Sequence, residues 1–276
     1  MATKFRMGEL TGGEARALAA RQPVILLPLG SHEDQGPHAP MGDYLSAEKV
    51  AERIAAAATA AGVETVVAPV LPFGGADYFG TMPMGIALSQ STLRAVLADM
   101  LSCLLRHGLT RIIVINGHGG NVQAVHEVTQ DIYRESKILI PSFYLWRVAY
   151  SYLPGILGAE TAAKAAGHGA DPLTSVAMHL FPELIRADMI PPKPTAPTVM
   201  GAPVINFGAI RFAGAEIAVP VELDEIAPNG VWSGDPSLCS AATGAALVDK
   251  LIEVGVKLAQ YVAEHGAEHG AEHGAK

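Results

Sequence analysis

The sequence is poor in cysteine and in charge, and it has no long apolar run. Only two cysteines, Cys103 and Cys239, occur among 276 residues, which does not indicate a disulfide framework. Cys103 lies in an apolar helical run, so we expect a buried thiol there. No apolar run approaches the ~20 residues that span a bilayer, and the N-terminus lacks the apolar core of a signal peptide. These absences predict a cytoplasmic protein without a membrane segment.

Charged residues make up only 17% of the chain, and the balance is acidic, with 19 Lys and Arg against 27 Asp and Glu. No cluster of Lys and Arg exceeds a dipeptide, which argues against binding to nucleic acid or to an anionic membrane. The expected partner is therefore a small molecule. Because 50% of the residues are hydrophobic, we expect a large core and burial of some exterior against sister subunits.

Apolar runs typical of strands alternate with stretches of helical periodicity through the first half of the chain. The expected strands are 23–29, 63–71, 111–115 and 137–145, and the expected helices are 47–61, 91–107 and 122–136. Four such alternations with right-handed crossovers build a mainly parallel β-sheet flanked by helices on both faces. The sequence therefore predicts the α/β class, with the loops after the strands gathered at one edge of the sheet.

The second half of the chain is less regular. A helix is expected to run from a cap at Asp171 or Thr174 to Leu180, and a hairpin is expected at 205–222, after a proline-rich extended stretch. A last helix at about 239–264 closes the domain, so we expect a single domain over residues 1–262. The remainder, 263–276, repeats Ala-Glu-His-Gly. Each Gly disfavours a helix by ~1 kcal/mol, so this tail is expected to be solvated and frayed.

The loop that follows the first strand is dense in metal-ligating side chains. It runs from Pro28 to Asp43, and Gly and Pro residues fix the turns between its acids and imidazoles. α/β enzymes carry reactive side chains on such loops. Zinc, manganese and iron accept mixed oxygen and nitrogen ligands, so the loop predicts a divalent cation site. The candidate ligands are His32, Glu33, Asp34, Gln35, His38 and Asp43.

Three motifs carry a resemblance to a known family. The first, Glu-Asp-Gln-Gly-Pro-His-Ala-Pro, occupies 33–40 and is followed by Asp43; the second, Asn-Gly-His-Gly-Gly-Asn, occupies 116–121. The third, Gly-Val-Trp-Ser-Gly-Asp-Pro, occupies 230–236. In these motifs the chain resembles the creatininase (creatinine amidohydrolase) family. The resemblance implies a creatininase-like α/β fold, hydrolytic activity, and a homo-oligomer, the relatives being hexamers.

The resemblance carries Glu33, Asp43 and His118 over as the ligands of one divalent metal ion. His118 stands between glycines at the end of a strand, where the backbone can present its imidazole well. Each residue also has a plainer interpretation: a surface histidine, a loop salt bridge for Glu33, or the cap of the following helix for Asp43. The expected cofactor is zinc, manganese or iron, with one or two ions per subunit.

The chain departs from the family at the second metal. Relatives carry a metal-binding histidine where this chain has Gln35, so His38, three residues further on, is the candidate substitute ligand. The alternative for His38 is a histidine bonded to a ligand carboxylate. Gln35 itself would be a weak neutral ligand, which agrees with a weaker or absent second metal ion. Asp77 and Tyr78 fall roughly where relatives carry Glu-His.

Proton transfer is assigned to a later segment. His168 and Asp171 lie in a stretch that resembles a family segment, His-Ala-Gly-Glu, with Asp in place of Glu. An imidazole near a metal can pass a proton to a departing nitrogen, so we expect His168, with Asp171, to be catalytic. The alternative is a loop histidine beside a helix-capping aspartate. Trp146 and Trp232 either line the substrate pocket or are structural.

The leading hypothesis is a metal-dependent hydrolase that uses an activated water to cleave a non-peptide amide C–N bond, cyclic amides included. Creatinine itself is not expected, because the residues after His118 and around His168 differ from those that accompany that substrate. One alternative is a deformylase-like hydrolase of a nucleotide or cofactor precursor, which would use the same site. Another is a metal-poor, non-catalytic binding or assembly protein of the same fold.

Overall fold

Four parallel strands form the main sheet, in the order β2–β1–β3–β4. They are β1 (Val24–Leu29), β2 (Thr65–Val67), β3 (Ile112–Asn116) and β4 (Ser142–Tyr144). The computed structural model describes residues 4–266, and in it β1 pairs with both β2 and β3, which places Leu26 beside Val67 and Ile113. The predicted α/β class with a mainly parallel sheet is confirmed.

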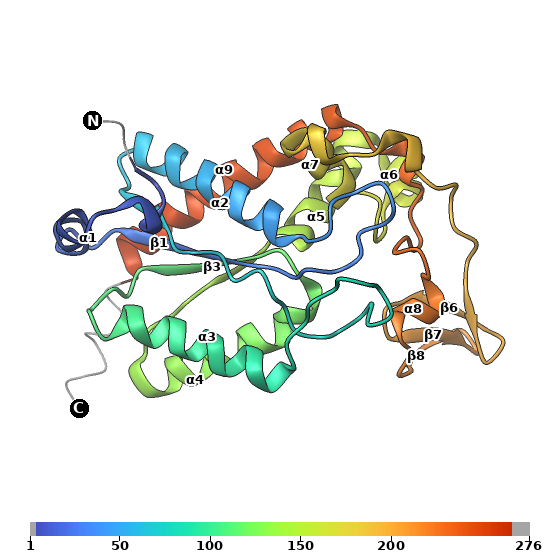
Figure 1. Ribbon diagram of the computed structural model, residues 1–276, viewed down its shortest axis with the longest axis horizontal. Coiled ribbons are helices and arrows are strands. Elements are labelled where there is room, and N and C mark those ends of the chain that lie inside the picture. Colours follow the sequence, from blue (N-terminus) through green and yellow to red (C-terminus); the bar gives the residue numbers. More distant parts are fainter. Residues whose placement is uncertain (1–3, 267–276) are drawn as a thin grey trace.

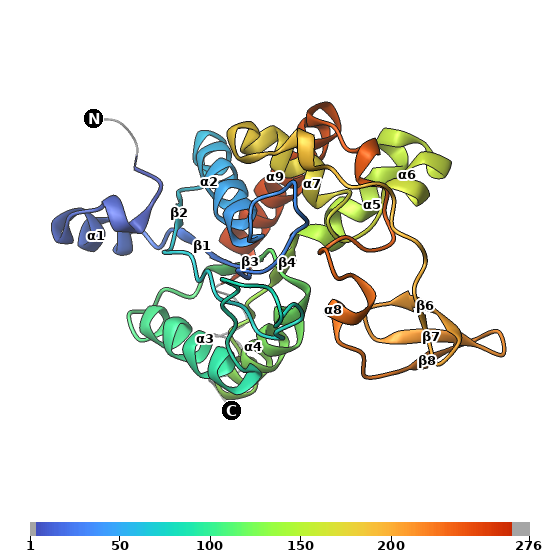
Figure 2. The same ribbon diagram turned by 45° about the vertical axis from the view of Figure 1, so that its right-hand side comes forward.

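Helices cover both faces of this sheet (Figure 1; Figure 2). One face is covered by α2 (Tyr44–Ala60), α5 (Leu145–Leu157), α7 (Leu173–Leu180) and α9 (Ala241–His265). The other face is covered by α3 (Gln90–Leu105) and α4 (Val122–Ser136). Before the first strand, α1 (Gly12–Ala19) begins with a capping box formed by Thr11 and Glu14. Within residues 4–266, no helix is both long and apolar enough to cross a membrane.

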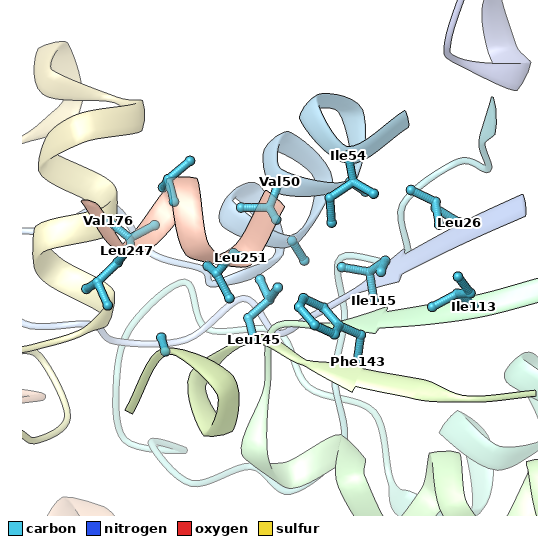
Figure 3. Close-up of a cluster of buried hydrophobic side chains, with 14 of the residues drawn as sticks. Leu26, Val50, Ile54, Ile113, Ile115, Phe143, Leu145, Val176, Leu247 and Leu251 are labelled. Carbon is cyan, nitrogen blue, oxygen red and sulfur yellow. The ribbon is translucent and has the colours of Figure 1, made fainter. Parts of the chain in front are cut away.

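The side chains of β1 alternate between two hydrophobic cores, which is why the whole strand is apolar. All six residues of β1 are buried. Leu26 joins Val50 and Ile54 of α2 on one face (Figure 3), whereas Ile25 and Leu27 join side chains of α3 and α4 on the other. The strand is thereby fixed from both sides, and it positions the loop that follows at the carboxyl edge of the sheet.

Helix α9 packs closely on α7 and α2 because glycine faces each neighbour. A β-carbon at Gly244 would collide with the Ser175 carbonyl of α7, and one at Gly255 would collide with Ile54 of α2. The missing side chains let the helix axes approach and close the core on this face of the sheet.

A second, antiparallel sheet stands beyond the carboxyl edge of the main sheet (Figure 1). Its strands are β5 (Thr198–Val199), β6 (Ala202–Asn206), β7 (Ala209–Phe212) and β8 (Ala215–Ala218), in that order. Its apolar side chains share a small core with Phe79, from the loop after β2, and with the short helix α8 (Leu223–Ile226). The predicted hairpin at 205–222 is therefore part of a larger sheet, and the proline-rich stretch supplies its first strand.

Two strands of the main sheet are shorter than expected. β2 and β4 have three residues each, against predicted strands at 63–71 and 137–145. β4 is short because α4 ends with Lys137 in left-handed backbone and α5 begins directly after Tyr144. The stretch after Tyr144, for which the sequence predicts no element, forms α5 and α6 (Ala159–Ala165).

The prediction of a buried thiol at Cys103 is wrong, because this residue is exposed. Helix α3 buries Leu93, Leu97 and Leu101, and Cys103 falls on its outward side. The last helix, expected at about 239–264, is α9 and ends at His265, so it includes the first residues of the repetitive tail. The domain boundary at residue 262 stays a prediction. The rest of the tail, 267–276, lies outside the described residues.

Candidate metal centre

Two neighbouring strands deliver the expected metal ligands to one place. β1 ends at Leu29 and β3 ends at Asn116, and these two residues pair in the sheet. The loop after β1 carries Glu33 and Asp43, and the turn after β3 carries His118. Parallel strands in register therefore bring residues that are distant in the sequence to the same edge.

Glu33, Asp43 and His118 form a group at this edge. His118 Nδ1 lies 3.1 Å from Asp43 Oδ2 and 3.3 Å from Glu33 Oε1. One ligating atom from each residue lies within 4.8 Å of the others, and all three side chains are buried. This spread is compatible with ligand distances of about 2 Å to a single ion. The structure thus brings together the three residues that the sequence predicts as ligands.

The hydrogen bonds of His118 orient its ring so that the group can bind a cation. Its Nε2 lies 3.2 Å from the Gly75 carbonyl oxygen, which can only accept, so Nε2 carries the donated hydrogen. In the neutral imidazole Nδ1 then holds a lone pair, and this lone pair faces two carboxylates. The arrangement is repulsive unless Nδ1 is protonated or a cation stands between the three groups. Metal-ligating histidines commonly donate their other ring N–H in this way.

Burial and charge act together on the pKa values of the three groups. Burial raises the pKa of Asp43, against the opposing effect of His118. Burial also works against ionisation of Glu33, but the His118 and His168 imidazoles lower the pKa of Glu33 to about 2. For His118, burial disfavours the charged form, yet the two carboxylates raise its pKa well above the usual value. The group therefore favours a positive charge at its centre, either a proton or a metal ion.

Asp43 precedes α2 but does not cap that helix with its side chain. Its Oδ1 instead accepts hydrogen bonds from the Ser31 backbone N–H, at 2.7 Å, and from the Ser31 hydroxyl, at 3.3 Å. These bonds fix the carboxylate and leave Oδ2 turned toward His118. The structure therefore supports the ligand interpretation of Asp43 over the helix cap.

Gln35 contacts the group, whereas His38 bonds to a residue outside it. Gln35 Nε2 donates a hydrogen bond to Glu33 Oε1 at 3.2 Å, so an N–H rather than a lone pair faces that carboxylate. His38 Nε2 lies 3.3 Å from the hydroxyl oxygen of Thr174 in α7, and burial lowers the pKa of His38. His38 is not one of the three residues brought together, and its role as a substitute ligand stays a prediction.

His168 faces the group from the loop before α7. Its Nδ1 lies 2.7 Å from the Gly230 carbonyl oxygen and donates to it, which leaves Nε2 turned toward Glu33 Oε1, 3.7 Å away. The rings of Phe79 and Phe207 pack against the imidazole, with centroid distances of 4.9 and 5.6 Å. The ring is therefore held in one orientation and one neutral tautomer, as a proton carrier requires.

Asp171 stands apart from His168. In the described part of the chain, the two ring nitrogens of His168 contact Gly230 and Glu33, not Asp171. Asp171 is fully buried near Ser175, and burial raises its pKa. No side chain caps α7, so Asp171 does not cap it either. The expected relay from His168 to Asp171 has no contact to support it here, and a catalytic role for Asp171 stays a prediction.

The ligand group opens into a cavity of about 250 Å³. Trp146 forms part of its wall, and the indole N–H donates to the Gly117 carbonyl. Trp232 is not in the wall; it packs against Phe207, with ring centroids 5.1 Å apart. The cavity is lined by Glu33, Gln35, Asp43, Tyr78, His118, Gly119, Tyr144, Trp146, His168, Leu173 and Phe207.

Three of the lining residues, Tyr144, Leu173 and Phe207, are not indicated as site residues by the sequence. Phe207 lies in the turn between β6 and β7, and only the fold brings this turn to the cavity. Tyr144 ends β4, beside Asn116 in the sheet. Of these three residues, only Tyr144 could have been identified from the sequence, because the strand that contains it was expected to end at the functional edge of the sheet.

A larger cavity, of about 520 Å³, lies at the opposite end of β1, beside α1. Its lining is mainly apolar and includes Met7, Leu18 and Leu109, with Arg16 and His107 among its polar members. Its lining contains no carboxylate and a single imidazole, so it offers no set of convergent ligands for a cation. Convergent ligands, rather than volume, identify the candidate functional site.

Comparison with known proteins matches the chain to one family. The creatininase family model, described as creatinine amidohydrolase, matches residues 8–259. A mycofactocin precursor peptide peptidase from Mycobacterium ulcerans is 24% identical over 260 residues, which cover 90% of this chain and 88% of the relative. A creatinine amidohydrolase from Pseudomonas putida is 28% identical over 219 residues, which cover 71% of this chain and 79% of the relative.

Solved creatininases share the fold. A mutant creatininase of the Zn-Zn type superposes with a TM-score of 0.74, and a creatininase described as Mn superposes with a TM-score of 0.73. Each is 22% identical, and each match covers 96% of this chain and 100% of the other. Together with the family match over residues 8–259, these likenesses establish that the chain is a divergent member of the creatininase family.

Proposed function

We propose that the protein is a metal-dependent hydrolase that cleaves an amide C–N bond with water. The observation that carries the proposal is the buried group in which His118 Nδ1 faces the Glu33 and Asp43 carboxylates. Two acids and a neutral imidazole form a donor set that zinc and manganese accept. The Zn-Zn and Mn forms of the solved creatininases support the same choice of metals.

The protein's own residues hold and shape this centre. A cation bound there would polarise the substrate carbonyl and activate a water molecule for attack. The amide and hydroxyl of Ser31 orient Asp43, and the Gly75 carbonyl orients His118, so the ligand atoms keep their positions. Trp146 and Phe207 supply apolar walls that narrow the space around the reacting groups.

His168 is the proposed proton carrier. Because its Nδ1–H is bound to the Gly230 carbonyl, the lone pair of Nε2 is directed toward Glu33 at the cavity wall. From this position the imidazole takes a proton from the attacking water and delivers it to the nitrogen that leaves when the C–N bond breaks. General acid–base catalysis of this kind contributes about 10² to 10⁴-fold to a rate.

The centre is proposed to hold one cation per chain. A second ion beside the first would need additional lone pairs next to Glu33, but Gln35 presents an N–H to this carboxylate. Among residues 4–266, Glu33, Asp43 and His118 are the one group of at least three acidic, His or Cys residues close enough to share an ion. The glutamine at the position of the family histidine thus favours a mononuclear site.

The bond that is cleaved is proposed to lie in a compact amide group, linear or cyclic. A cavity of about 250 Å³ is smaller than the ~300–1,000 Å³ of pockets for drug-sized ligands. The name of one relative refers to a peptide, which has linear amide bonds, and that of another refers to creatinine, which has a cyclic one. The expected restriction to non-peptide bonds therefore stays a prediction.

A substrate panel tests the proposal. Cyclic amides, N-formyl compounds and short peptides are incubated with protein loaded separately with Zn²⁺, Mn²⁺ or Fe²⁺. We expect at least one compound to be hydrolysed, with activity lost on chelation and restored by the metal. Hydrolysis of N-formyl compounds alone would favour the deformylase alternative. A protein that leaves the whole panel intact would favour the binding or assembly alternative.

The quaternary structure is a separate proposal. We propose a homo-oligomer, and the resemblance implies a hexamer. The oligomeric state is measured on the same samples by size-exclusion chromatography with light scattering. A monomer at micromolar concentration would contradict it.

A further inference from the structure

Two tyrosine hydroxyls, those of Tyr78 and Tyr144, belong to side chains that line the cavity beside the metal ligands. Within residues 4–266, neither hydroxyl makes a hydrogen bond to another protein group. The hydroxyl of a tyrosine on a cavity wall is a donor available to the molecule that the cavity binds. Both hydroxyls can therefore donate a hydrogen bond to a molecule that enters the cavity.

The two tyrosines differ in how firmly the fold holds them. Tyr144 is the last residue of β4, paired in register with Asn116, at the same sheet edge as His118. Tyr78 lies in the loop after β2, and its ring packs against His118 and Phe207, with centroid distances of 5.7 and 6.2 Å. A donor that stabilises developing charge must be fixed before the reaction, which favours the tyrosine at the end of a strand.

Gly119 leaves room for the Tyr144 hydroxyl because it has no side chain. A β-carbon at Gly119 would lie 3.1 Å from the Tyr144 hydroxyl oxygen, closer than an ordinary van der Waals contact. The residue after His118 is therefore coupled to the tyrosine, because a β-carbon there would require the hydroxyl to shift by a few tenths of an ångström. This contact links the Asn-Gly-His-Gly-Gly-Asn motif to Tyr144.

The Tyr144 hydroxyl stays protonated throughout the neutral range. Burial raises the pKa of Tyr144, and the negative charge of Asp43 acts in the same direction. A neutral O–H beside a cationic centre is able to donate a hydrogen bond to an oxygen that gains negative charge.

We propose that the Tyr144 hydroxyl donates a hydrogen bond to the carbonyl oxygen of the scissile amide as that oxygen gains negative charge. The inference rests on the proposed amide hydrolysis and adds a catalytic residue to it. When water adds to the carbonyl carbon, the C=O electron pair moves onto the oxygen, and the bond from Tyr144 strengthens at that moment. No proton is transferred from the hydroxyl, so Tyr144 remains unchanged through the cycle.

Tyr144→Phe tests the inference with the substrate of the panel that is hydrolysed fastest. Loss of one such donor typically lowers kcat by about 10² to 10³-fold, and we expect KM to change by less than about threefold. The metal content should equal that of the wild type. Tyr133→Phe makes the same change on the exposed face of α4 and should leave kcat unaltered. An unchanged kcat in Tyr144→Phe, or a loss of bound metal, would overturn the inference.

Gly119→Ala gives a second route to the same loss. Its β-carbon should displace the hydroxyl and lower kcat in the same direction, and the double variant should be no slower than Tyr144→Phe alone. Independent, additive losses would show that the two residues do not act on one hydrogen bond. The rate of the Gly119→Ala single variant remains informative if Tyr144→Phe is poorly folded.

A binding measurement separates failure of this inference from failure of the proposed function. Acetohydroxamic acid carries an amide-like carbonyl oxygen and binds metal centres, so it is titrated into the manganese-loaded wild type and Tyr144→Phe. We expect at least tenfold weaker binding in the variant. If the wild type hydrolyses nothing but this difference is found, amide hydrolysis is wrong and the donor role stands. Equal affinities would refute the donor role.

Discussion

His118 Nδ1 lies 3.1 Å from Asp43 Oδ2 although 75 residues separate the two in the chain. Two neighbouring parallel strands create this contact, because Asp43 follows β1 and His118 follows β3. Each side chain is held by a bond on its far side, from Ser31 to Asp43 and from His118 to Gly75. The facing atoms are thereby left for a cation, and most of the predictions below depend on this arrangement.

Metal binding should release a proton at neutral pH. In the metal-free protein the two carboxylates raise the pKa of His118 well above its usual value, so Nδ1 carries a proton at pH 7. A metal ion at Nδ1 displaces this proton, so affinity falls as pH is lowered, by about tenfold per unit for one proton released. The affinity stops rising once the pH exceeds the raised pKa. Calorimetric titration with Zn²⁺ in buffers of different ionisation enthalpy measures the proton count, and a count of zero contradicts the account.

Gln35→His should add a second cation. Gln35 directs an N–H at Glu33 Oε1, and an imidazole would replace this donor with a lone pair beside the same carboxylate. We expect the Zn²⁺ content to rise from about one to about two equivalents per chain. Gln123→His, on the exposed face of α4, adds a histidine away from the site and is the matched control. A wild type that already binds two ions tightly would refute the mononuclear centre.

His168→Gln should lower kcat and leave the metal content unchanged. The substitution removes the basic Nε2 that faces Glu33, so we expect a loss of about 10² to 10⁴-fold in kcat. His126→Gln, on the surface of α4, should have no effect. A wild-type rate in His168→Gln would remove His168 from the mechanism. Asp171→Asn tests the remaining prediction for Asp171, since a relay through it requires a comparable loss.

Gly244→Ala should destabilise the fold. Its methyl group would collide with the Ser175 carbonyl at the contact of α9 with α7, and overpacking of this kind costs about 1–3 kcal/mol in the free energy of unfolding. Gly155→Ala, in α5, meets open space and should stabilise the protein by about 0.5–1 kcal/mol through helix propensity. Urea unfolding compares the two variants, and equal effects would contradict the close packing of α9.

The sequence predicts those parts of the fold and site that local patterns determine. The apolar runs of β1 and β3 are continuous because both faces of the sheet are covered, so these strands could be found without the structure. Glu33 and His118 lie shortly after these strands and Asp43 ends the loop that follows β1, so the rule that strand ends share one edge predicts that they meet. The resemblance to the creatininase family selected these three residues as ligands, and chain order and strand polarity predicted that they would converge.

The remainder depends on tertiary contacts that no local pattern encodes. Phe207 enters the cavity only because the antiparallel sheet stands beyond the edge of the main sheet. His168 and Asp171 are close in sequence and were expected to act together, yet the Nδ1 of His168 bonds to the carbonyl of Gly230, 62 residues away. Cys103 is exposed because α3 buries only one stripe of its apolar residues. Periodicity alone did not identify the outward side of that helix.

Metal content tests the central claim most directly. It is measured by mass spectrometry on protein in which the tail histidines His265, His269 and His273 are replaced by Gln, so that the tail does not contribute. The wild-type site should hold about one equivalent of Zn²⁺ or Mn²⁺ per chain, and Glu33→Gln should abolish tight binding. Asp34→Asn, which alters the neighbouring buried acid outside the ligand group, should retain the ion. Equal metal content in Glu33→Gln and Asp34→Asn, or no bound metal in the wild type, would contradict the account.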